Sequence, residues 1–324
     1  MRNRTIDIAR GIGILSIIVG HFGISYVTRV VYTYHIPLFY LFTGYFLKRE
    51  ELVPFIRKKA RGLLVPYLVT CIAIIAISEV VSLLQGKGIS GEWILRSLYG
   101  AGSDYKSPVQ PIGAIWFLWA TFWGSILLQV GLRFRSALRI VYILSLFILG
   151  LSTSRVFWLP LSIQAGCCAV LFMYVGYCAK DIRLHKDVEA LGVAMAALAW
   201  ISFIHNFQSF YLVRNDFGRG WIDIMASLCG CYVVVIVSRL IDRNPHKLAE
   251  VLSLIGRHSI IILCVHLIEM DLIDWWAVVE ALESMGITSL VCQVLAVCMK
   301  FLIIIGMTYL ITKSRKFSGL FALK

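Results

Sequence analysis

The sequence predicts an all-α polytopic membrane protein with about ten transmembrane helices and both termini in the cytoplasm. Three observations lead to this fold class: 59% of the 324 residues are hydrophobic, only 15% are charged, and long apolar runs recur along the whole chain. Soluble domains carry about 25% charged residues, and an apolar run of roughly 18 residues or more is typical of a transmembrane helix. We therefore expect one integral membrane domain over residues 1–324.

The apolar runs define ten candidate spans, because a helix needs about 20 residues to cross the hydrocarbon core. The nine cysteines fall within apolar stretches and form no CxxC pair, so we interpret them as small apolar residues and expect no metal site. The predicted spans are residues 6–26, 31–47, 62–84, 113–132, 138–153, 157–179, 188–204, 220–238, 258–276 and 286–312.

The distribution of Lys and Arg predicts the orientation of these spans. Cytoplasmic loops of membrane proteins are enriched in basic residues, and with both termini inside every inner segment is basic. The same loops account for the net charge of +13, so no nucleic-acid partner is expected. The predicted outer connections, of which residues 85–112 are the longest, hold only Arg29, Lys87, Arg96, Lys106, Arg155, Arg214 and Arg219.

The first span, in IDIARGIGILSIIVGH, carries ionisable residues that an apolar membrane anchor would not need. A charge near the bilayer centre costs about 2.5–3.5 kcal/mol, so such residues are rare and usually functional. Arg10 and His21 are about three helical turns apart, so both project from nearly one face, separated by ~16 Å along the axis. The topology places Arg10 near the cytoplasm and His21 near the outer side. Asp7 is expected to be structural, as a local partner of Arg10.

Structural alternatives apply to each of these residues. The Arg10 side chain could extend to the cytoplasmic headgroups, and His21 could be an interfacial histidine with a hydrogen-bond partner. His35, near the outer end of the second span, favours a functional site, because the short connection makes the two spans antiparallel neighbours and brings both imidazoles to a similar depth. Two imidazoles at one depth suggest a site that handles protons.

Further candidates lie elsewhere in the chain. FIRKKARGLLVPY carries Lys58, Lys59 and Arg61, which are either ordinary cytoplasmic cations or, with Arg10, a site for a phosphorylated ligand. His266 in the ninth span is equally compatible with packing and with a site. Lys300 lies near the middle of the last span, too deep to extend to the headgroups, and is expected to face the bundle interior.

Taken together, five sequence motifs resemble those of the acyltransferase-3 family, integral membrane O-acyltransferases of bacterial surface glycans. In chain order they are DIARGIGILSIIVGH with Arg10 and His21, HIPLFYLFTGYF with His35, RKKARGLLVPY, IGAIWFLWA with Trp116, and IGRHSIIILCVH with His266. The resemblance runs from residue 4 to about residue 312. It implies a multi-pass protein of the bacterial inner membrane that transfers an acyl group from cytoplasmic acyl-coenzyme A to a hydroxyl on the outer side.

The resemblance also implies roles for individual residues. His21 would be the central catalytic residue, and Arg10 would help to bind the donor or hold the geometry of the site. From the residues themselves we expect His35 to assist or position, and Lys58, Lys59 and Arg61 to bind the donor together with Arg10. The donor is expected to be acetyl-coenzyme A, and the acceptor a glycan or lipid-linked saccharide that meets the protein among membrane lipids. Trp116 and His266, which lie in these motifs, and Lys300, which is expected to face the bundle interior, are predicted to line the substrate site.

The competing class is a transporter, in which Arg10, His21 and Lys300 form a proton relay that drives export of a glycan or lipid-linked sugar. Intramembrane ionisable residues occur in both classes. Release of free thiol from an acyl-coenzyme A donor distinguishes them, because only the enzyme breaks the thioester.

Overall fold

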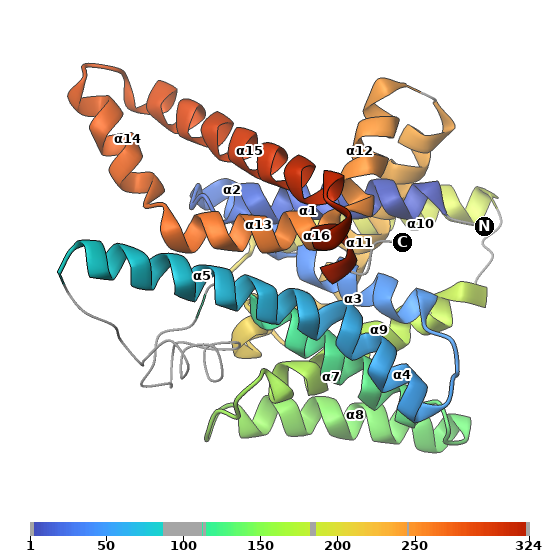
Figure 1. The fold of residues 1–324 in the computed structure, drawn as a ribbon. Coiled ribbons are helices and arrows are strands. Elements are labelled where there is room, and N and C mark those ends of the chain that lie inside the picture. The colour runs from blue at the N-terminus through green and yellow to red at the C-terminus, as the bar shows by residue number, and fades with distance from the viewer. Residues whose placement is uncertain (1–2, 87–111, 113–114, 182–185, 245, 322–324) are drawn as a thin grey trace.

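A computed structural model describes residues 3–86, 112, 115–181, 186–244 and 246–321, and in this part of the chain the fold is helical, with no strand beyond one isolated bridge (Figure 1). The α-helices are α1 (Arg4–Gly20), α2 (Ser25–Tyr32), α3 (His35–Phe46), α4 (Leu52–Lys59), α5 (Val65–Leu84), α7 (Trp116–Gly131), α8 (Ser136–Thr153), α9 (Ile163–Cys178), α10 (Lys186–His205), α11 (Trp221–Arg243), α12 (Lys247–Arg257), α13 (Ser259–Leu272), α14 (Trp275–Ser284), α15 (Ser289–Lys313) and α16 (Arg315–Leu320).

The all-α prediction is confirmed, and each of the ten predicted spans contains a helix. By length and composition, however, four described helices could cross a membrane: Leu52–Leu84, Ser136–Thr153, Trp221–Arg243 and Ser289–Lys313. A bent pair, α12 with α13, brings the number to five. Ten spans and cytoplasmic termini therefore stay predictions. The predicted outer loop 85–112, with Lys87, Arg96 and Lys106, lies almost wholly outside the described residues.

Helix α1 runs through the middle of the molecule, in contact with α2, α3, α11, α12 and α13 (Figure 1). The α1–α3 pairing is antiparallel, as predicted: Gly20 lies against Val31, Gly13 against Phe39, and Arg10 over the ring of Phe46. As the residue number falls along α1, the residue number of the contacting side chain rises, from Val31 in α2 to Phe46 at the end of α3. The ring of His21 and that of His35 therefore lie at the same end of this helix pair.

Two glycines allow α3 and α9 to approach closely. A Cβ atom at Gly44 would lie 1.7 Å from the backbone oxygen of Met173, and one at Gly176 would lie 2.0 Å from that of Leu41. Such small-residue contacts are common between membrane helices, where close packing drives association. They hold α3 on α9 and so fix the surface that α3 presents to α1.

The Gly44→Ala variant is expected to lower stability by about 1–3 kcal/mol, because the added methyl group must push two packed backbones apart. Thermal unfolding of the detergent-purified protein measures the effect. Gly306→Ala is the matched control, since a Cβ atom on that α15 glycine meets nothing within 4 Å. If both variants unfold at the wild-type temperature, the α3–α9 contact does not stabilise the protein.

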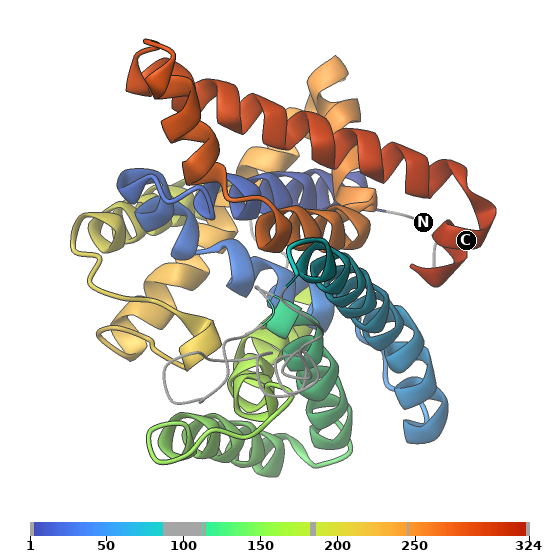
Figure 2. The same ribbon diagram turned by 60° about the vertical axis from the view of Figure 1, so that its left-hand side comes forward.

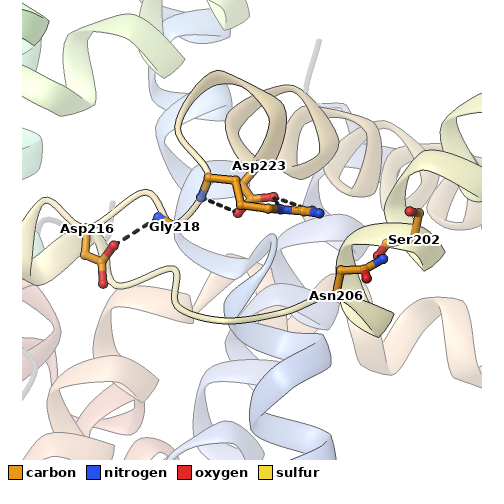
Figure 3. A network of polar contacts seen from close by, with 6 residues as sticks. Ser202, Asn206, Asp216, Gly218 and Asp223 are labelled. Carbon is orange, nitrogen blue, oxygen red and sulfur yellow. Dashed lines mark hydrogen bonds and ion pairs between the residues drawn. The ribbon is translucent and has the colours of Figure 1, made fainter.

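The connection between α10 and α11 is held by polar contacts of its own (Figure 3). The Asp223 carboxylate is buried and accepts hydrogen bonds from the backbone N–H of Arg219 at 2.8 Å and from its guanidinium at 2.6 Å. Asp216 accepts from Gly218 N–H at 2.9 Å and forms an isolated bridge with Tyr211. The Tyr211 ring meets that of Tyr32 at 5.5 Å between centroids, so this connection packs against the end of α2.

The C-terminal part bends sharply between α12 and α13, by 73° at His258. A Cβ atom at Gly256 would lie 1.7 Å from Asp7 O, and one at Gly11 would lie 2.2 Å from Leu252 O, so α12 is packed directly on α1. Helix α13 contacts α5, α15 and α1. Helices α14 and α15 form a hairpin at the edge of the molecule opposite α8 (Figure 2). This arrangement brings α13, α15 and the end of α1 together.

Candidate active site

His21 lies at the C-terminal end of α1, and its nearest ionisable partner is His266 of α13. His21 Nδ1 and His266 Nε2 are 2.9 Å apart, a hydrogen-bond distance, and the two rings stack at 5.2 Å between centroids. His21 is the residue that caps α1, and its backbone N–H still bonds to Ile17 O. The helix is therefore continuous from Arg10 to His21, as their shared face requires.

Glu269 connects His266 to two further residues. His266 Nδ1 lies 2.7 Å from Glu269 Oε1, and Lys300 Nζ lies 3.2 Å from the same oxygen. The other oxygen, Oε2, accepts a hydrogen bond from Trp275 Nε1. His266 is 0% exposed, Lys300 2% and Glu269 4%, so this is a buried and fully connected polar cluster. We call His21, His266, Glu269, Lys300 and Trp275 the relay cluster.

A pocket of about 420 Å³ opens beside the relay cluster. Pockets of ~300–1,000 Å³ are the usual size for small-molecule sites. Three members of the cluster line it: His21 at the end of α1, Trp275 of α14 and Lys300 of α15. The described residues that line it are His21, Phe22, Met270, Asp271, Leu272, Ile273, Asp274, Trp275, Trp276 and Lys300.

His35 lies near His21 but is not its hydrogen-bond partner within the described part of the chain. His35 Nδ1 is 2.7 Å from the Val31 carbonyl, which can only accept, so this nitrogen carries a proton. The Tyr32 ring contacts both imidazoles, at 6.3 Å from His21 and 5.0 Å from His35 between centroids. The common depth of His21 and His35 in the membrane stays a prediction.

The Arg10 end of α1 gathers basic side chains near the end of α3. The Arg10 guanidinium lies 5.2 Å from the centroid of the Phe46 ring, and Lys59 lies within electrostatic range of Arg10. Lys180 donates to the backbone oxygen of Leu47, next to Phe46. The structure thus brings Lys59 to Arg10 and adds Lys180, a cation that the sequence did not single out.

The other predicted donor-binding cations point elsewhere. Lys58 is exposed and forms an ion pair with Glu50 at 2.9 Å, and Arg61 is exposed in the π-helical turn Ala60–Leu64. This turn precedes Pro66, which has no N–H group to continue the regular helical ladder. Lys59 and Arg61 are two positions apart, and residues at this spacing on a helix do not share a face.

Asp7 and Trp116 are both buried, away from the relay cluster. Asp7 is 4% exposed, and its carboxylate lies 4.0 Å from Arg257 Nε. Arg257 is thus a partner that the sequence did not indicate, on the helix that packs against α1. Trp116 begins α7 within the main hydrophobic core, where its ring meets that of Phe117 at 6.2 Å.

The sequence interpretation missed Glu269, Trp275 and Asp271. Glu269 was detectable in principle, because it follows His266 by three residues on an apolar helix and so lies on the same face. Asp271 and Trp275 belong to the segment where α13 gives way to α14, and only the fold brings this segment to His21.

Comparison with known proteins adds an independent line of evidence. A family model described as an acyltransferase domain, that of the acyltransferase-3 family, matches residues 3–311. The nodulation protein NolL of Mesorhizobium japonicum is 26% identical over 257 residues, which cover 70% of this chain and 64% of that protein. The chain thus spans less than two thirds of the length of this curated relative. No solved structure matches the chain.

Proposed function

The chain belongs to the acyltransferase-3 family, and on this basis we propose that it transfers an acyl group, acetyl first among the candidates, from cytoplasmic acyl-coenzyme A to a hydroxyl of a cell-surface or lipid-linked glycan. The observation that carries the proposal is the hydrogen-bonded series His21–His266–Glu269 beside a pocket of ligand size. The bacterial inner membrane is the proposed location, in keeping with the apolar helices.

The relay cluster explains how His21 acts as a base. Lys300 and Trp275 can only donate to Glu269, so an ionised carboxylate satisfies all of its contacts. His266 then donates from Nδ1 to Glu269, and its Nε2 accepts from His21 Nδ1–H. This order leaves the Nε2 lone pair of His21 free to accept a proton.

The proposed reaction is a direct transfer with His21 as general base and then general acid. His21 Nε2 removes the proton of the acceptor hydroxyl as its oxygen attacks the thioester carbonyl carbon. The carbon–sulfur bond breaks, and the departing sulfur takes the proton from His21 to leave as the thiol of coenzyme A. Glu269, through His266, stabilises the positive charge that His21 carries in between. His35 keeps its proposed role as a nearby positioning residue.

The donor is proposed to enter from the Arg10 end. Arg10, Lys59 and Lys180 suit the phosphates of coenzyme A, since cations bind phosphate through charge-assisted hydrogen bonds. Lys58 and Arg61 would assist from the surface. His21 lies ~16 Å further along the same helix, a distance on the scale of the uncharged pantetheine arm.

The Arg10→Gln variant is expected to raise KM for acetyl-coenzyme A by at least about tenfold, with a smaller change in kcat, because it removes a hydrogen-bonded charge at the donor end. Initial-rate kinetics on purified protein measure both constants. Arg133→Gln is the control, since Arg133 is exposed after α7, away from α1. An unchanged KM in Arg10→Gln would contradict donor binding by this residue.

Thioester cleavage tests the proposal against proton-coupled export. Membranes that contain the protein are supplied with acetyl-coenzyme A and a glycan acceptor, and free thiol is measured. Thiol release that depends on the acceptor supports the enzyme. Movement of the saccharide across the membrane without thiol release would contradict it. Mass spectrometry of surface glycans with and without the protein then identifies the added group and the sugar that carries it.

A further inference from the structure

The pocket beside His21 has a negative lining. Asp271 and Asp274 both contribute to its wall. The basic side chains of the lining are His21 and Lys300, and the Lys300 ammonium is already paired with Glu269 at 3.2 Å, a contact that balances one positive and one negative charge. The acidic side chains that remain to face a bound molecule are therefore Asp271 and Asp274.

The two carboxylates differ in how they are used within the protein. Asp274 Oδ1 caps α14, accepting from the N–H groups of Trp276 at 3.0 Å and Ala277 at 3.1 Å. Asp271 makes no hydrogen bond or ion pair with any other residue that the structure describes. Its carboxylate is available to accept hydrogen bonds from the hydroxyl groups of a ligand, next to the base that would remove a hydroxyl proton.

Aromatic rings form the apolar part of the pocket. The chain turns at Gly23, where φ is +86°, and this turn leaves the Phe22 ring 5.8 Å from that of Trp276. Trp276 is half exposed and also contributes to the lining. An exposed indole beside hydrogen-bond acceptors suits a sugar ring, whose C–H face packs on the indole while its hydroxyls reach the acceptors.

From this charge and shape we propose that the pocket selects a saccharide unit with no carboxylate or phosphate beside its reacting hydroxyl, and that it rejects acidic sugars at that position. The inference rests on the proposed function for the identity of the reacting hydroxyl. It adds a specificity rule set by Asp271 and Asp274, because an anion placed against two carboxylates is repelled.

Three probes with the same ring and different charge test the rule: methyl glucoside, methyl glucuronide and methyl glucosaminide. Binding to the detergent-purified protein is measured without donor, by calorimetric titration. The glucosaminide is expected to bind at least as tightly as the glucoside, and the glucuronide at least about tenfold more weakly than either. Equal affinity for the glucuronide, or no binding of any probe, would overturn the inference.

Two variants assign the selectivity to the pocket. Asp271→Asn is expected to reduce the difference in affinity between glucuronide and glucoside to a few-fold. Glu280→Gln removes a charge from an exposed residue of α14 outside the pocket, and it should leave this difference in affinity unchanged. Trp276→Ala should weaken all three probes alike. If the ratio of glucuronide affinity to glucoside affinity were unchanged in Asp271→Asn, the proposed selection against acidic sugars would be wrong. Because binding needs no thioester, a protein that ranks the probes by charge but releases no thiol would refute the proposed function alone.

Discussion

Replacing His21 by glutamine is expected to lower acyl transfer by about 10²–10⁴-fold, the usual contribution of a general acid–base group. Glutamine is similar in reach and retains hydrogen-bonding capacity toward His266, but it cannot take the proton of the acceptor hydroxyl. The loss should therefore fall on kcat, while binding of acetyl-coenzyme A changes little. The measurement is the initial rate of thiol release with saturating donor and acceptor.

His246→Gln is the matched control for this variant. His246 is an exposed histidine that precedes α12, and it lies outside the pocket lining and the relay cluster. Its transfer rate should equal that of the wild type. If His21→Gln also transferred acyl groups at the wild-type rate, His21 would not be the base, and the proposed mechanism would be wrong.

Glu269→Ala is expected to cost about 3–5 kcal/mol of stability, because it leaves the buried ammonium of Lys300 without its counter-charge. His266 and Trp275 would lose their acceptor as well. Thermal unfolding of purified protein should show a large drop, and transfer should fall with it. A drop in activity alone could reflect unfolding, so a second variant is needed.

The double variant Glu269→Ala with Lys300→Met separates folding from catalysis. Methionine removes the unpaired charge while it fills a similar volume, so stability should recover relative to Glu269→Ala. Transfer should stay low, because nothing then holds the His266 tautomer that orients His21. A double variant with full activity would show that Glu269 has no role beyond pairing with Lys300. Wild-type stability in the single variant would contradict the buried ion pair itself.

The sequence was sufficient for the features that depend on one helix or on adjacent ones. The shared face of Arg10 and His21 follows from helical periodicity, and the antiparallel α1–α3 pair follows from a short connection. Helical segments were likewise predictable from apolar runs. The predicted spans 6–26 and 31–47 are nevertheless shorter as helices, because the chain turns at Gly23 and forms the separate helix α2 before α3 begins.

The features that the sequence did not predict depend on contacts between distant segments. The 73° bend at His258 places α12 on α1 through Gly11 and Gly256, and no local pattern encodes such packing. The bend directs α13 so that His266, rather than His35, meets His21. The ion pair of Glu269 with Lys300 joins α13 to α15, and neither residue alone reveals its partner.

We propose that one helix, α1, connects a donor-binding end on the cytoplasmic side to a reaction end on the outer side. The most direct test uses sealed vesicles with the protein in one orientation, acetyl-coenzyme A labelled in its acetyl carbons on the cytoplasmic face, and the saccharide acceptor on the other. We expect a labelled ester on the saccharide, detected by mass spectrometry, and its loss in the His21→Gln variant. Saccharide that crosses the membrane unlabelled, with the thioester intact, would contradict this proposal.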